Sequence, residues 1–287
     1  MVGKGLNMTD QELKELRVAA AKVRIGIIEG VFHAKSGHPG GSLSSADIMT
    51  YLYFKEMNID PQNPRMENRD RFVLSKGHCA PGLYSTLANR GYFSTEELKS
   101  LRHIGAMLQG HPDMKGTPGI DMSTGSLGQG ISAAVGMALA GKLDNKTYRV
   151  YALLGDGEIQ EGQVWEAAMF AGHKKLDNLC LFVDYNGLQI DGRIEDVGGP
   201  EPIDEKFKAF GFEVMSINGN CFEEIEKAVE WAKTVQDKPV AIIAKTIKGR
   251  GVSFMEDKAS WHGKAPNAEE YEIAMKELKA NLAKEEQ

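Results

Sequence analysis

Four short apolar runs in the second half of the chain limit its possible folds more than any other feature. The runs, in which most side chains are apolar, are residues 149–154, 179–184, 212–217 and 240–245. Runs of this length and continuity are typical of buried parallel strands whose sheet is covered on both faces. Helical patterns alternate with these runs, at about 162–173, 204–210, 222–235 and 268–282. The alternation predicts an α/β fold: a doubly wound, mostly parallel sheet with helices on both faces.

The first half of the chain carries mainly helical patterns. Thr9 and Glu12 form a capping-box pattern, which predicts a helix from residue 10 to about 33. Other predicted elements are helices at about 46–57, 81–90 and 130–143, a strand at 71–75, a helical turn capped by Ser94, and Gly-rich segments at 36–45 and 105–130. We expect one domain, residues 1–287, that begins with a helical segment at 1–35 and ends with the helix at about 268–282.

Composition and charge exclude several classes of protein. The 287 residues carry a net charge of −6, from 34 basic and 40 acidic side chains, which argues against a general nucleic-acid or membrane-surface binder. The sequence contains no recognisable signal peptide or membrane span. The three cysteines, Cys79, Cys180 and Cys221, form no C-x-x-C pair, which fits thiols in a reducing compartment. We therefore expect a cytoplasmic globular protein in which local groups bind any anionic ligand.

Polar residues follow two neighbouring runs at the point where each predicted strand ends. The run 149–154 is followed by Gly155-Asp156-Gly157-Glu158, and Asn186 follows the next run, 30 positions after Asp156. One β–α–β crossover spans about 30 residues, so both side chains should reach the same edge of the sheet. Carboxylate and amide oxygens suit Mg²⁺ or Ca²⁺, and substrate phosphates usually complete a Mg²⁺ site. The flanking glycines would let a diphosphate approach, and a helix beginning near Glu161 would direct its N–H groups at the anion.

A tight turn without a ligand is the simpler interpretation of Gly155-Asp156-Gly157. For this motif alone, the tight turn is the better interpretation. Asn186, which follows a second predicted strand at the distance of one crossover, makes a site for a metal ion and a diphosphate the better interpretation of the two motifs together.

Four of the seven histidines stand next to glycine in loop-like contexts. They are His38 in Ser-Gly-His-Pro-Gly, His78 in Ser-Lys-Gly-His, His111 in Gly-His-Pro and His262 in Ser-Trp-His-Gly. Each histidine, taken singly, is better explained as a structural residue. Together they are harder to explain that way, because catalytic groups gather in loops beyond a rigid sheet. Imidazole titrates near neutrality and can donate or accept a proton, so the set indicates proton-transfer chemistry.

These motifs together resemble the transketolase family of thiamine diphosphate enzymes. Gly-Asp-Gly, a crossover and then Asn is similar to the thiamine diphosphate signature. Four further runs resemble transketolase: Asp70-Arg-Phe-Val-Leu-Ser-Lys-Gly-His78, Ser123-Thr-Gly-Ser-Leu-Gly-Gln-Gly130, Lys245-Thr-Ile-Lys-Gly-Arg-Gly251 and Glu256-Asp-Lys-Ala-Ser-Trp-His262. The resemblance extends from about residue 10 to 280 in the expected order. It identifies the chain as the N-terminal, diphosphate-binding part of a transketolase.

The resemblance implies roles for residues at the matching positions. In the family, a metal ion is bound at positions matching the side chains of Asp156 and Asn186 and the backbone carbonyl of Leu188. The ion is expected to be Mg²⁺, with Ca²⁺ or Mn²⁺ as alternatives. The implied cofactor-binding residues are His78, Gly125, Ser126, Leu127, Gly155, Asp156, Gly157, Glu158, Asn186, Lys248 and His262. The implied catalytic residues are His38, His78, His111 and His262, with Glu161 in a carboxylate network between two cofactor sites.

The resemblance also implies a partner. Complete transketolases carry a second α/β domain, which binds the aminopyrimidine of the cofactor and supplies a glutamate, and then a C-terminal domain. We therefore expect a C-terminal partner subunit, an α2β2 complex, and transfer of a two-carbon ketol unit between sugar phosphates, as in the pentose phosphate pathway. A truncated transketolase would have the same sequence features as a natural subunit.

Two other functions stay open. One is another thiamine diphosphate enzyme: a deoxyxylulose-phosphate synthase relative, an oxoacid dehydrogenase α-subunit, or a split enzyme for an unusual sugar phosphate. The four histidines disfavour the dehydrogenase. The other is a cofactor-binding module without activity, which the presence of Asp156, Asn186 and the histidines disfavours. Residues 128–133 and 136–142 match dinucleotide and P-loop motifs only loosely, and we assign no nucleotide site to them.

Overall fold

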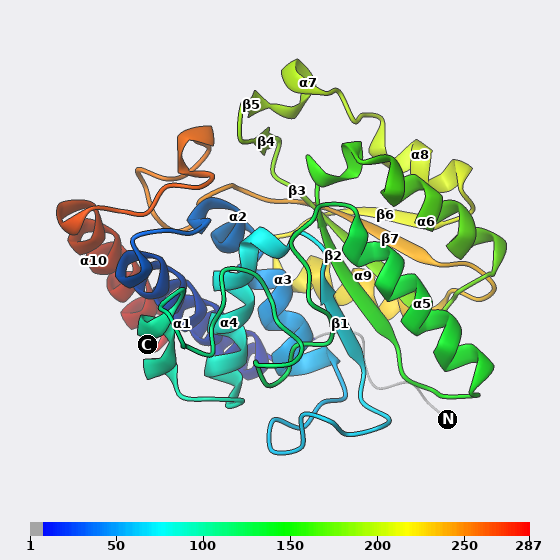
Figure 1. The fold of residues 1–287 in the computed structure, drawn as a ribbon, viewed down its shortest axis with the longest axis horizontal. Coiled ribbons are helices and arrows are strands. Elements are labelled where there is room, and N and C mark those ends of the chain that lie inside the picture. Colours follow the sequence, from blue (N-terminus) through cyan, green and yellow to red (C-terminus); the bar gives the residue numbers. More distant parts are fainter. Residues whose placement is uncertain (1–7) are drawn as a thin grey trace.

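Five parallel strands form the central sheet of the computed structural model, which describes residues 8–287 (Figure 1). In sheet order they are β1 (Arg71–Leu74), β2 (Val150–Gly155), β3 (Leu179–Tyr185), β7 (Val240–Lys245) and β6 (Glu213–Asn218). All neighbouring strands run parallel, and Gly155 at the end of β2 lies in register with Asp184 near the end of β3. The predicted doubly wound, parallel α/β fold is confirmed.

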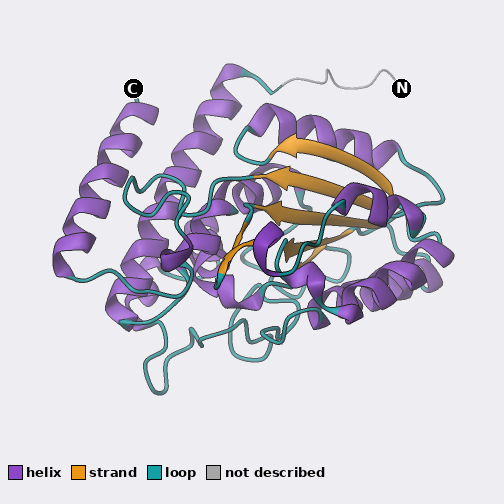
Figure 2. Ribbon diagram, turned by 90° about the horizontal axis from the view of Figure 1, so that it is seen from above, coloured by secondary structure: helices purple, strands orange, loops and turns teal. Residues whose placement is uncertain are grey.

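The sheet separates two apolar clusters because alternate side chains of each strand point to opposite faces. On β2, Tyr151 and Leu153 belong to one cluster, whereas Val150, Ala152 and Leu154 belong to the other. The first face is covered by α3 (Ala46–Tyr51), α4 (Ala80–Arg90) and α9 (Phe222–Thr234), and the second by α5 (Gln129–Leu143), α6 (Gly162–His173) and α8 (Ile203–Ala209). Figure 2 shows helices on either side of the strands.

Two long helices form a further layer beside the first face. The helices α1 (Asp10–Ala34) and α10 (Ala268–Glu285) pack along each other, and a third apolar cluster joins them to α2 (Pro39–Ser44). Each of the two begins with a capping box, formed by Thr9 with Glu12 in α1 and by Asn267 with Glu270 in α10. The N-terminal helix and its predicted cap are therefore confirmed.

Short elements complete the fold. They are α7 (Ile194–Val197), a hairpin of β4 (Leu188–Gln189) and β5 (Gly192–Arg193), 3-10 turns at Gly77–Cys79, Thr95–Ser100, Glu158–Gln160 and Ala259–Trp261, and a π-helical turn at Leu52–Glu56. The segment 101–128 contains no helix or strand, as its glycine and proline content predicts.

Three local predictions differ from the structure. The run 212–217 was expected to be a buried strand, but β6 lies at the sheet edge and Ile217 is its one buried residue. The Gly-rich segment 36–45 contains α2, because proline is well suited to the first position of a helix. The helix expected at 46–57 becomes a π-helical turn after Tyr51. Residues 1–7 of the predicted N-terminal segment lie outside the described residues.

Two glycines of α5 differ in the space around them, and they provide a matched test of the packing. A methyl group at exposed Gly136 would meet no atom within 4 Å, whereas one at Gly141 would lie 2.9 Å from the Tyr148 ring. Gly136→Ala should stabilise the protein by about 0.5–1 kcal/mol, because alanine reduces the freedom of the unfolded chain. Gly141→Ala should destabilise it by about 1–3 kcal/mol through overpacking. Urea unfolding measures both changes, and effects of the same sign would contradict this packing.

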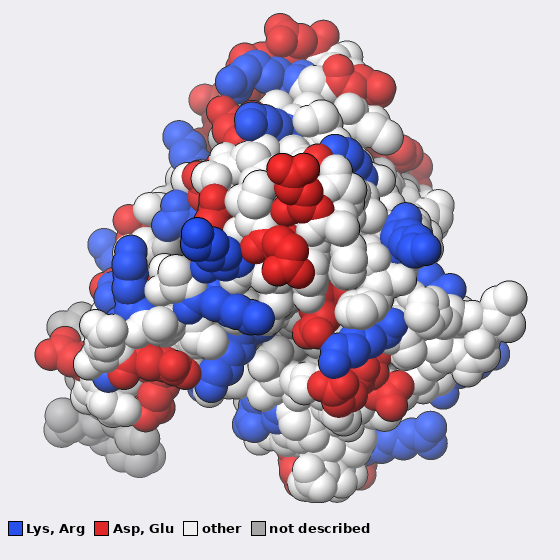
Figure 3. Space-filling model, turned by 90° about the vertical axis from the view of Figure 1, so that its left-hand side faces the viewer, with Lys and Arg blue, Asp and Glu red and all other residues white. Residues whose placement is uncertain are grey.

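Charged side chains of both signs are interspersed on the face that forms the left-hand side of Figure 1 (Figure 3). Within the described residues, this face lacks the continuous basic patch that is typical of nucleic-acid binders. Among residues 8–287, no helix is both long enough and apolar enough to cross a membrane.

Candidate functional site

A pocket of about 350 Å³ lies at the carboxyl ends of the strands, where open parallel sheets bind their ligands. The strand β1 leads to Lys76 and His78, β2 to Asp156, β3 to Asn186 and β7 to Lys248. The pocket is lined by His38, Gly41, Lys76, His78, Cys79, His111, Gly125, Leu127, Gly155, Asp156, Gly157, Glu158, Asp184, Asn186, Leu188, Gln189, Ile190, Lys248 and His262.

Asp156 contributes a buried carboxylate to this pocket. The residue is 3% exposed, and its two oxygens accept hydrogen bonds from the N–H groups of Gly157 (2.8 Å) and Gly187 (2.6 Å). None of the salt bridges among residues 8–287 involves Asp156. Burial and the nearby Asp184 raise the pKa of Asp156 to about 6. A buried carboxylate that forms no ion pair with the described residues is suited to binding a cation.

Asn186 and Leu188 lie in the turn that Asp156 contacts through Gly187. The Asn186 amide nitrogen donates to Asp184 at 3.0 Å, and its amide oxygen accepts from the Leu188 N–H at 3.1 Å. The Leu188 carbonyl accepts a hydrogen bond from the Lys248 ammonium at 2.8 Å, so this oxygen already faces a cationic group. The structure therefore brings the three predicted metal ligands together at one strand edge.

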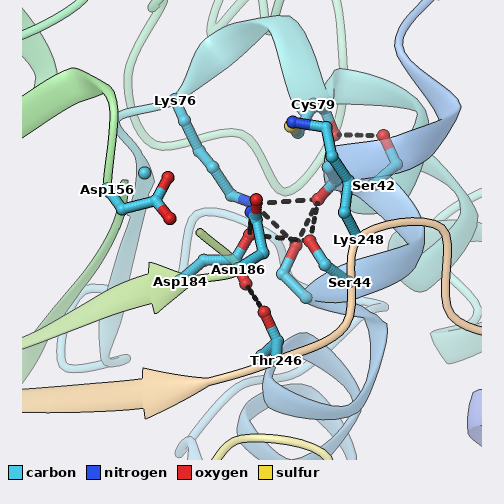
Figure 4. Close-up of polar contacts among 12 residues, drawn as sticks. Ser42, Ser44, Lys76, Cys79, Asp156, Asp184, Asn186, Thr246 and Lys248 are labelled. Carbon is cyan, nitrogen blue, oxygen red and sulfur yellow. Dashed lines mark hydrogen bonds and ion pairs between the residues drawn. The ribbon is translucent and has the colours of Figure 1, made fainter. Parts of the chain in front are cut away.

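Behind these residues, Lys76 and Asp184 form a buried ion pair (Figure 4). The Lys76 Nζ lies 2.7 Å from Asp184 Oδ2, and the two side chains are 2% and 0% exposed. Asp184 also accepts hydrogen bonds from the hydroxyl groups of Ser44 (2.7 Å) and Thr246. Burial alone would raise the pKa of Asp184, but the Lys76 ammonium and these hydrogen bonds lower it below its usual value. Asp184 is therefore an anion held inside the protein.

Glu158 is another buried acid at this edge, and the chain itself satisfies its carboxylate. The carboxylate accepts hydrogen bonds from the Ser75 hydroxyl (2.5 Å) and from the N–H groups of Gly128 (3.0 Å) and Gly155 (3.1 Å). Glu158 therefore joins the loop 125–128 to the end of β2, in addition to lining the pocket.

Three of the predicted histidines form a cluster within the pocket. The ring centroids of His38 and His78 are 5.1 Å apart, those of His38 and His262 are 5.4 Å apart, and those of His78 and His262 are 5.2 Å apart. The Lys248 ammonium lies 3.1 Å from Nδ1 of His262. The His111 ring packs over Gly125, where a Cβ atom would come within 3.0 Å of it. All four histidines are therefore within one pocket, as the sequence predicts.

Burial keeps the clustered imidazoles neutral near pH 7. It lowers the pKa of His38 and His78 to about 4 and that of His262 to about 3. Positive neighbours add to the effect, because Lys76 faces His78 and Lys248 faces His262. A neutral imidazole has one N–H donor and one acceptor, so each ring can bind either a hydroxyl or a carbonyl oxygen.

The histidine cluster should make the free protein less stable as the pH falls from about 6.5 to about 4. Unfolded histidine takes up its proton near pH 6.5, whereas His38, His78 and His262 in the folded protein stay neutral to about pH 4 or below. The unfolded state binds more protons in this window, so lowering the pH favours unfolding. NMR titration of the imidazole C–H resonances should give flat shifts for these rings above about pH 5, with the urea-unfolded protein as control. Midpoints near 6.5 in the folded protein would contradict the prediction.

The pocket contains every predicted site residue except Ser126 and Glu161. Ser126 is exposed, although its neighbours Gly125 and Leu127 line the pocket. Glu161 is exposed at the N-cap of α6, and neither it nor Gly162 lines the pocket. The helix α6 begins at Gly162, as expected, and a 3-10 turn lies between Asp156 and this helix, so the role of its first N–H groups in binding the anion stays a prediction.

Sequence analysis assigned no role to Lys76 and Asp184, although both line the pocket. One pattern in the sequence could have indicated that Asp184 has a basic partner, without identifying that partner. Asp184 is the last residue of the apolar run 179–184, and Lys76 is the second residue after the strand β1. Charged residues are seldom fully buried unless they are paired, so an acid inside a buried strand indicates a basic partner elsewhere in the chain.

A larger cavity, of about 590 Å³, lies between α1, α9 and α10, next to the segments that follow β6 and β7. Its lining includes the Arg24–Asp47 ion pair, at 2.6 Å, and further side chains of both signs. It contains none of the predicted site residues, and its mixed charges select no class of ligand. We therefore take the smaller pocket as the functional site.

The donor set of the smaller pocket fits a hard divalent cation with a bound diphosphate. Asp156 supplies a carboxylate, and Asn186 and Leu188 supply an amide and a carbonyl oxygen. In the described part of the chain, no cluster of three or more His, Cys, Asp or Glu side chains is placed to hold a metal ion. A cation at Asp156 would therefore need further oxygens from an anionic ligand, which is typical of Mg²⁺ with substrate phosphates.

Comparison with known proteins defines the class to which this fold and pocket belong. Residues 16–285 match the family described as "Transketolase, thiamine diphosphate binding domain". The chain belongs to this family, and the resemblance inferred from its sequence is confirmed.

Its relatives include transketolase subunits that it covers almost completely. It is 49% identical over 271 residues to the 6-deoxy-6-sulfo-D-fructose transketolase subunit of Clostridium sp. (strain MSTE9), an alignment that includes 94% of this chain and 98% of the relative. It is 42% identical over 273 residues to an apulose-4-phosphate transketolase subunit of Phocaeicola vulgatus, with 95% and 97% of the two chains aligned. The chain is therefore a transketolase N-terminal, thiamine diphosphate-binding domain similar to these subunits.

Longer transketolases match this chain over part of their length. Human transketolase is 46% identical over 258 residues, which are 88% of this chain and 40% of the human protein. The crystal structure of transketolase from Campylobacter jejuni has a TM-score of 0.85 at 35% identity, and the match covers 97% of this chain and 46% of that chain. The chain thus spans less than half the length of these longer enzymes.

Proposed function

We propose that this chain is the diphosphate-binding subunit of a two-subunit transketolase, with residues 1–287 forming one domain. The observation that carries the proposal is the buried Asp156 carboxylate, which lies at one strand edge with Asn186 and the Leu188 carbonyl. We assign these three groups to a divalent cation, Mg²⁺ in preference to Ca²⁺ or Mn²⁺. The family match of residues 16–285 supports thiamine diphosphate as the anionic ligand that completes the site.

The diphosphate is assigned to the groups that surround this cation site. Gly155 and Gly157 flank Asp156 and leave room for the anion to approach the backbone, and Glu158 holds that segment in place. The Lys248 ammonium, which lies between the Leu188 carbonyl and His262, supplies a positive charge beside the diphosphate. The loop beside the His111 ring is assigned to the rings of the cofactor, and it consists of Gly125, Ser126 and Leu127.

Thiamine diphosphate supplies the carbanion chemistry that breaks and forms the carbon–carbon bond. The histidines bind the substrate and move its protons. We assign His38 and His111 to the hydroxyl and carbonyl oxygens of the donor sugar. His78 and His262, whose rings stack on each other with His262 beside Lys248, are assigned to orientation and to proton transfer at the reacting carbonyl. The low pKa values of three of these rings support the proposal, because neutral imidazoles can donate or accept a hydrogen bond at each step.

We further propose a partner subunit that carries the pyrimidine-binding and C-terminal domains, in an α2β2 complex in the cytoplasm. The longer transketolases extend well beyond this chain, and the relatives that it covers almost completely are named as subunits. Glu161 is assigned to a carboxylate network between the two cofactor sites, which its exposure on this chain permits. The substrates are proposed to be sugar phosphates of the pentose phosphate pathway or, as the names of two relatives suggest, a less common sugar phosphate or a sulfonated sugar.

The test has a binding part and an activity part. Calorimetry of the chain with thiamine diphosphate should show binding in Mg²⁺ that EDTA removes. The chain mixed with a candidate C-terminal subunit should transfer a ketol unit from xylulose 5-phosphate, with a panel of aldose phosphates and sulfonated sugars as acceptors and donors. A reconstituted complex without metal-dependent cofactor binding would contradict the proposal. Binding without transfer to any acceptor would instead identify a cofactor-binding module without activity.

A further inference from the structure

The side-chain amide of Asn186 has two ends of opposite chemistry. Its oxygen can bind a cation, whereas its NH₂ group carries only donors. Rotation of the amide by 180° exchanges these two ends with almost no change in shape. A cation site built on an asparagine therefore needs partners that select one orientation.

Two partners select the orientation of Asn186. The amide nitrogen donates to Oδ2 of Asp184 at 3.0 Å, and the amide oxygen accepts from the N–H group of Leu188 at 3.1 Å. A carboxylate only accepts hydrogen bonds, and a backbone N–H group only donates them, so the reversed amide would meet repulsive contacts at both ends. The amide oxygen keeps a second lone pair, which is free to bind a cation.

Asp184 is itself fixed by groups from three other parts of the chain (Figure 4). Its Oδ2 atom accepts from the Lys76 ammonium and the Ser44 hydroxyl, each at 2.7 Å, and its Oδ1 atom accepts from the Thr246 hydroxyl. Ser44 ends α2, Lys76 follows β1, and Thr246 follows β7. A fully buried carboxylate held in this way cannot rotate independently of the strand ends, so it is a rigid reference point for the pocket.

We propose that Asp184 is a positioning residue that fixes the Asn186 amide with its oxygen available to the cation. The inference rests on the proposed function, because it assigns Asn186 to the cation site of a thiamine diphosphate enzyme. A purely structural role, in which Asp184 only balances the charge of Lys76, would not depend on the chemical nature of residue 186 once Lys76 is replaced by an uncharged residue. That difference makes the two roles separable by experiment.

The test compares Asp184→Asn with the double variant Asp184→Asn/Asn186→Asp. In the single variant, position 184 can offer either a donor or an acceptor to Asn186, so the orientation of the Asn186 amide is no longer fixed. In the double variant, a carboxylate at position 186 presents oxygen at both ends and needs no orienting partner. Thr246→Val is the matched control, because it removes a hydrogen bond from the other oxygen of Asp184 and leaves the contact with Asn186 in place.

Calorimetry with thiamine diphosphate at saturating Mg²⁺ provides the readout. Substitution of outer-shell partners typically lowers metal affinity 10–100-fold, so we expect Asp184→Asn to weaken cofactor binding about tenfold or more. Adding Asn186→Asp should recover at least about threefold of this loss. Thr246→Val should change binding less than about threefold. Circular dichroism checks that each variant is folded. Both variants are also compared with Lys76→Met added, which removes the ammonium that a carboxylate at position 186 could otherwise balance. The same comparison is used if the single variant does not fold.

Three results would overturn the inference: unchanged binding in Asp184→Asn, equal losses in Asp184→Asn and Thr246→Val, or no recovery in the double variant. Each of these requires a parent chain that binds thiamine diphosphate with Mg²⁺. A parent without metal-dependent binding, even in complex with a C-terminal subunit, would overturn the proposed function and this inference together. Parent binding that Asp184→Asn leaves intact would overturn only the inference.

Discussion

Asp156→Asn should remove metal-dependent binding of thiamine diphosphate while the free protein stays folded. The substitution keeps the size of the side chain and removes the carboxylate charge that faces the turn of Asn186 and Leu188. Substitution of outer-shell partners already lowers metal affinity 10–100-fold, so loss of a direct anionic ligand should weaken binding by at least about 100-fold. Calorimetric titration with Mg²⁺ measures this change, and ketol transfer by the reconstituted complex should fall with it.

The effect of the same substitution on the stability of the free protein should depend on pH between about 4 and about 6. The pKa of Asp156 is raised by burial from its usual 3.8 to about 6, so between these values the folded state keeps a proton that the unfolded state has lost. Stability therefore decreases as the pH rises through this window, and the full penalty is present above it. Asparagine carries no charge, so the variant lacks this penalty. Its NH₂ group, however, cannot accept the hydrogen bond from Gly157 or Gly187 that the second carboxylate oxygen accepts in the parent, which costs about 1–3 kcal/mol at any pH. The unfolding temperature of the ligand-free variant, relative to that of the parent, should therefore be higher at about pH 8 than at about pH 4.

Asp70 provides a matched control at the opposite end of the strands. It is 9% exposed, and its carboxylate accepts hydrogen bonds from the N–H groups of Asn58 (2.8 Å) and Arg149 (2.7 Å). Asp70→Asn removes the same charge from a similar environment outside the pocket. It should leave cofactor binding within about threefold of the parent, because it touches none of the assigned ligands. Similar losses in both variants, or normal binding by Asp156→Asn, would contradict the assignment of the cation site.

The parts of the fold that sequence predicts well are those that depend on local patterns. The helix α6 and the strand β7 have the expected bounds, because apolar periodicity and glycine positions are properties of short segments. The strand β6 was misjudged as buried, because its place at the sheet edge depends on strand order, which is a property of the whole chain. The hairpin β4–β5 is too short to leave a periodic pattern.

The candidate site shows the same division. Asp156 and Asn186 could be paired from sequence, because adjacent parallel strands end at one edge and the crossover length is recognisable. Lys76 and Asp184 could not be paired from sequence, because 108 positions separate them and neither belongs to a motif that predicts a contact with the other. The packing around a buried charge is decided by tertiary contacts, so their pairing became visible only in the structure.

Lys76→Met should be the most destabilising of the substitutions considered in the free protein, at about 3–5 kcal/mol. The side chain of Asp184 is 0% exposed, and without the ammonium it becomes an uncompensated charge inside the protein. Its remaining hydrogen bonds from Ser44, Thr246 and Asn186 cannot replace the lost counter-charge. Urea unfolding of the ligand-free chain measures the cost, and a loss below about 1 kcal/mol would place this pair among ordinary surface salt bridges.

A double-mutant cycle separates the pairing of the two charges from the packing of the lysine chain. Lys76→Met/Asp184→Asn leaves neither charge in the interior, so it should be more stable than either single variant. Lys238→Met is the control, because Lys238 lies 2.5 Å from Glu213 while both side chains are largely exposed, at 51% and 42%. That variant should lose less than about 1 kcal/mol, since water screens the charge that remains. A double variant less stable than both single variants would show that Lys76 contributes through its aliphatic contacts, and the ion pair would no longer explain why a lysine is buried beneath the pocket.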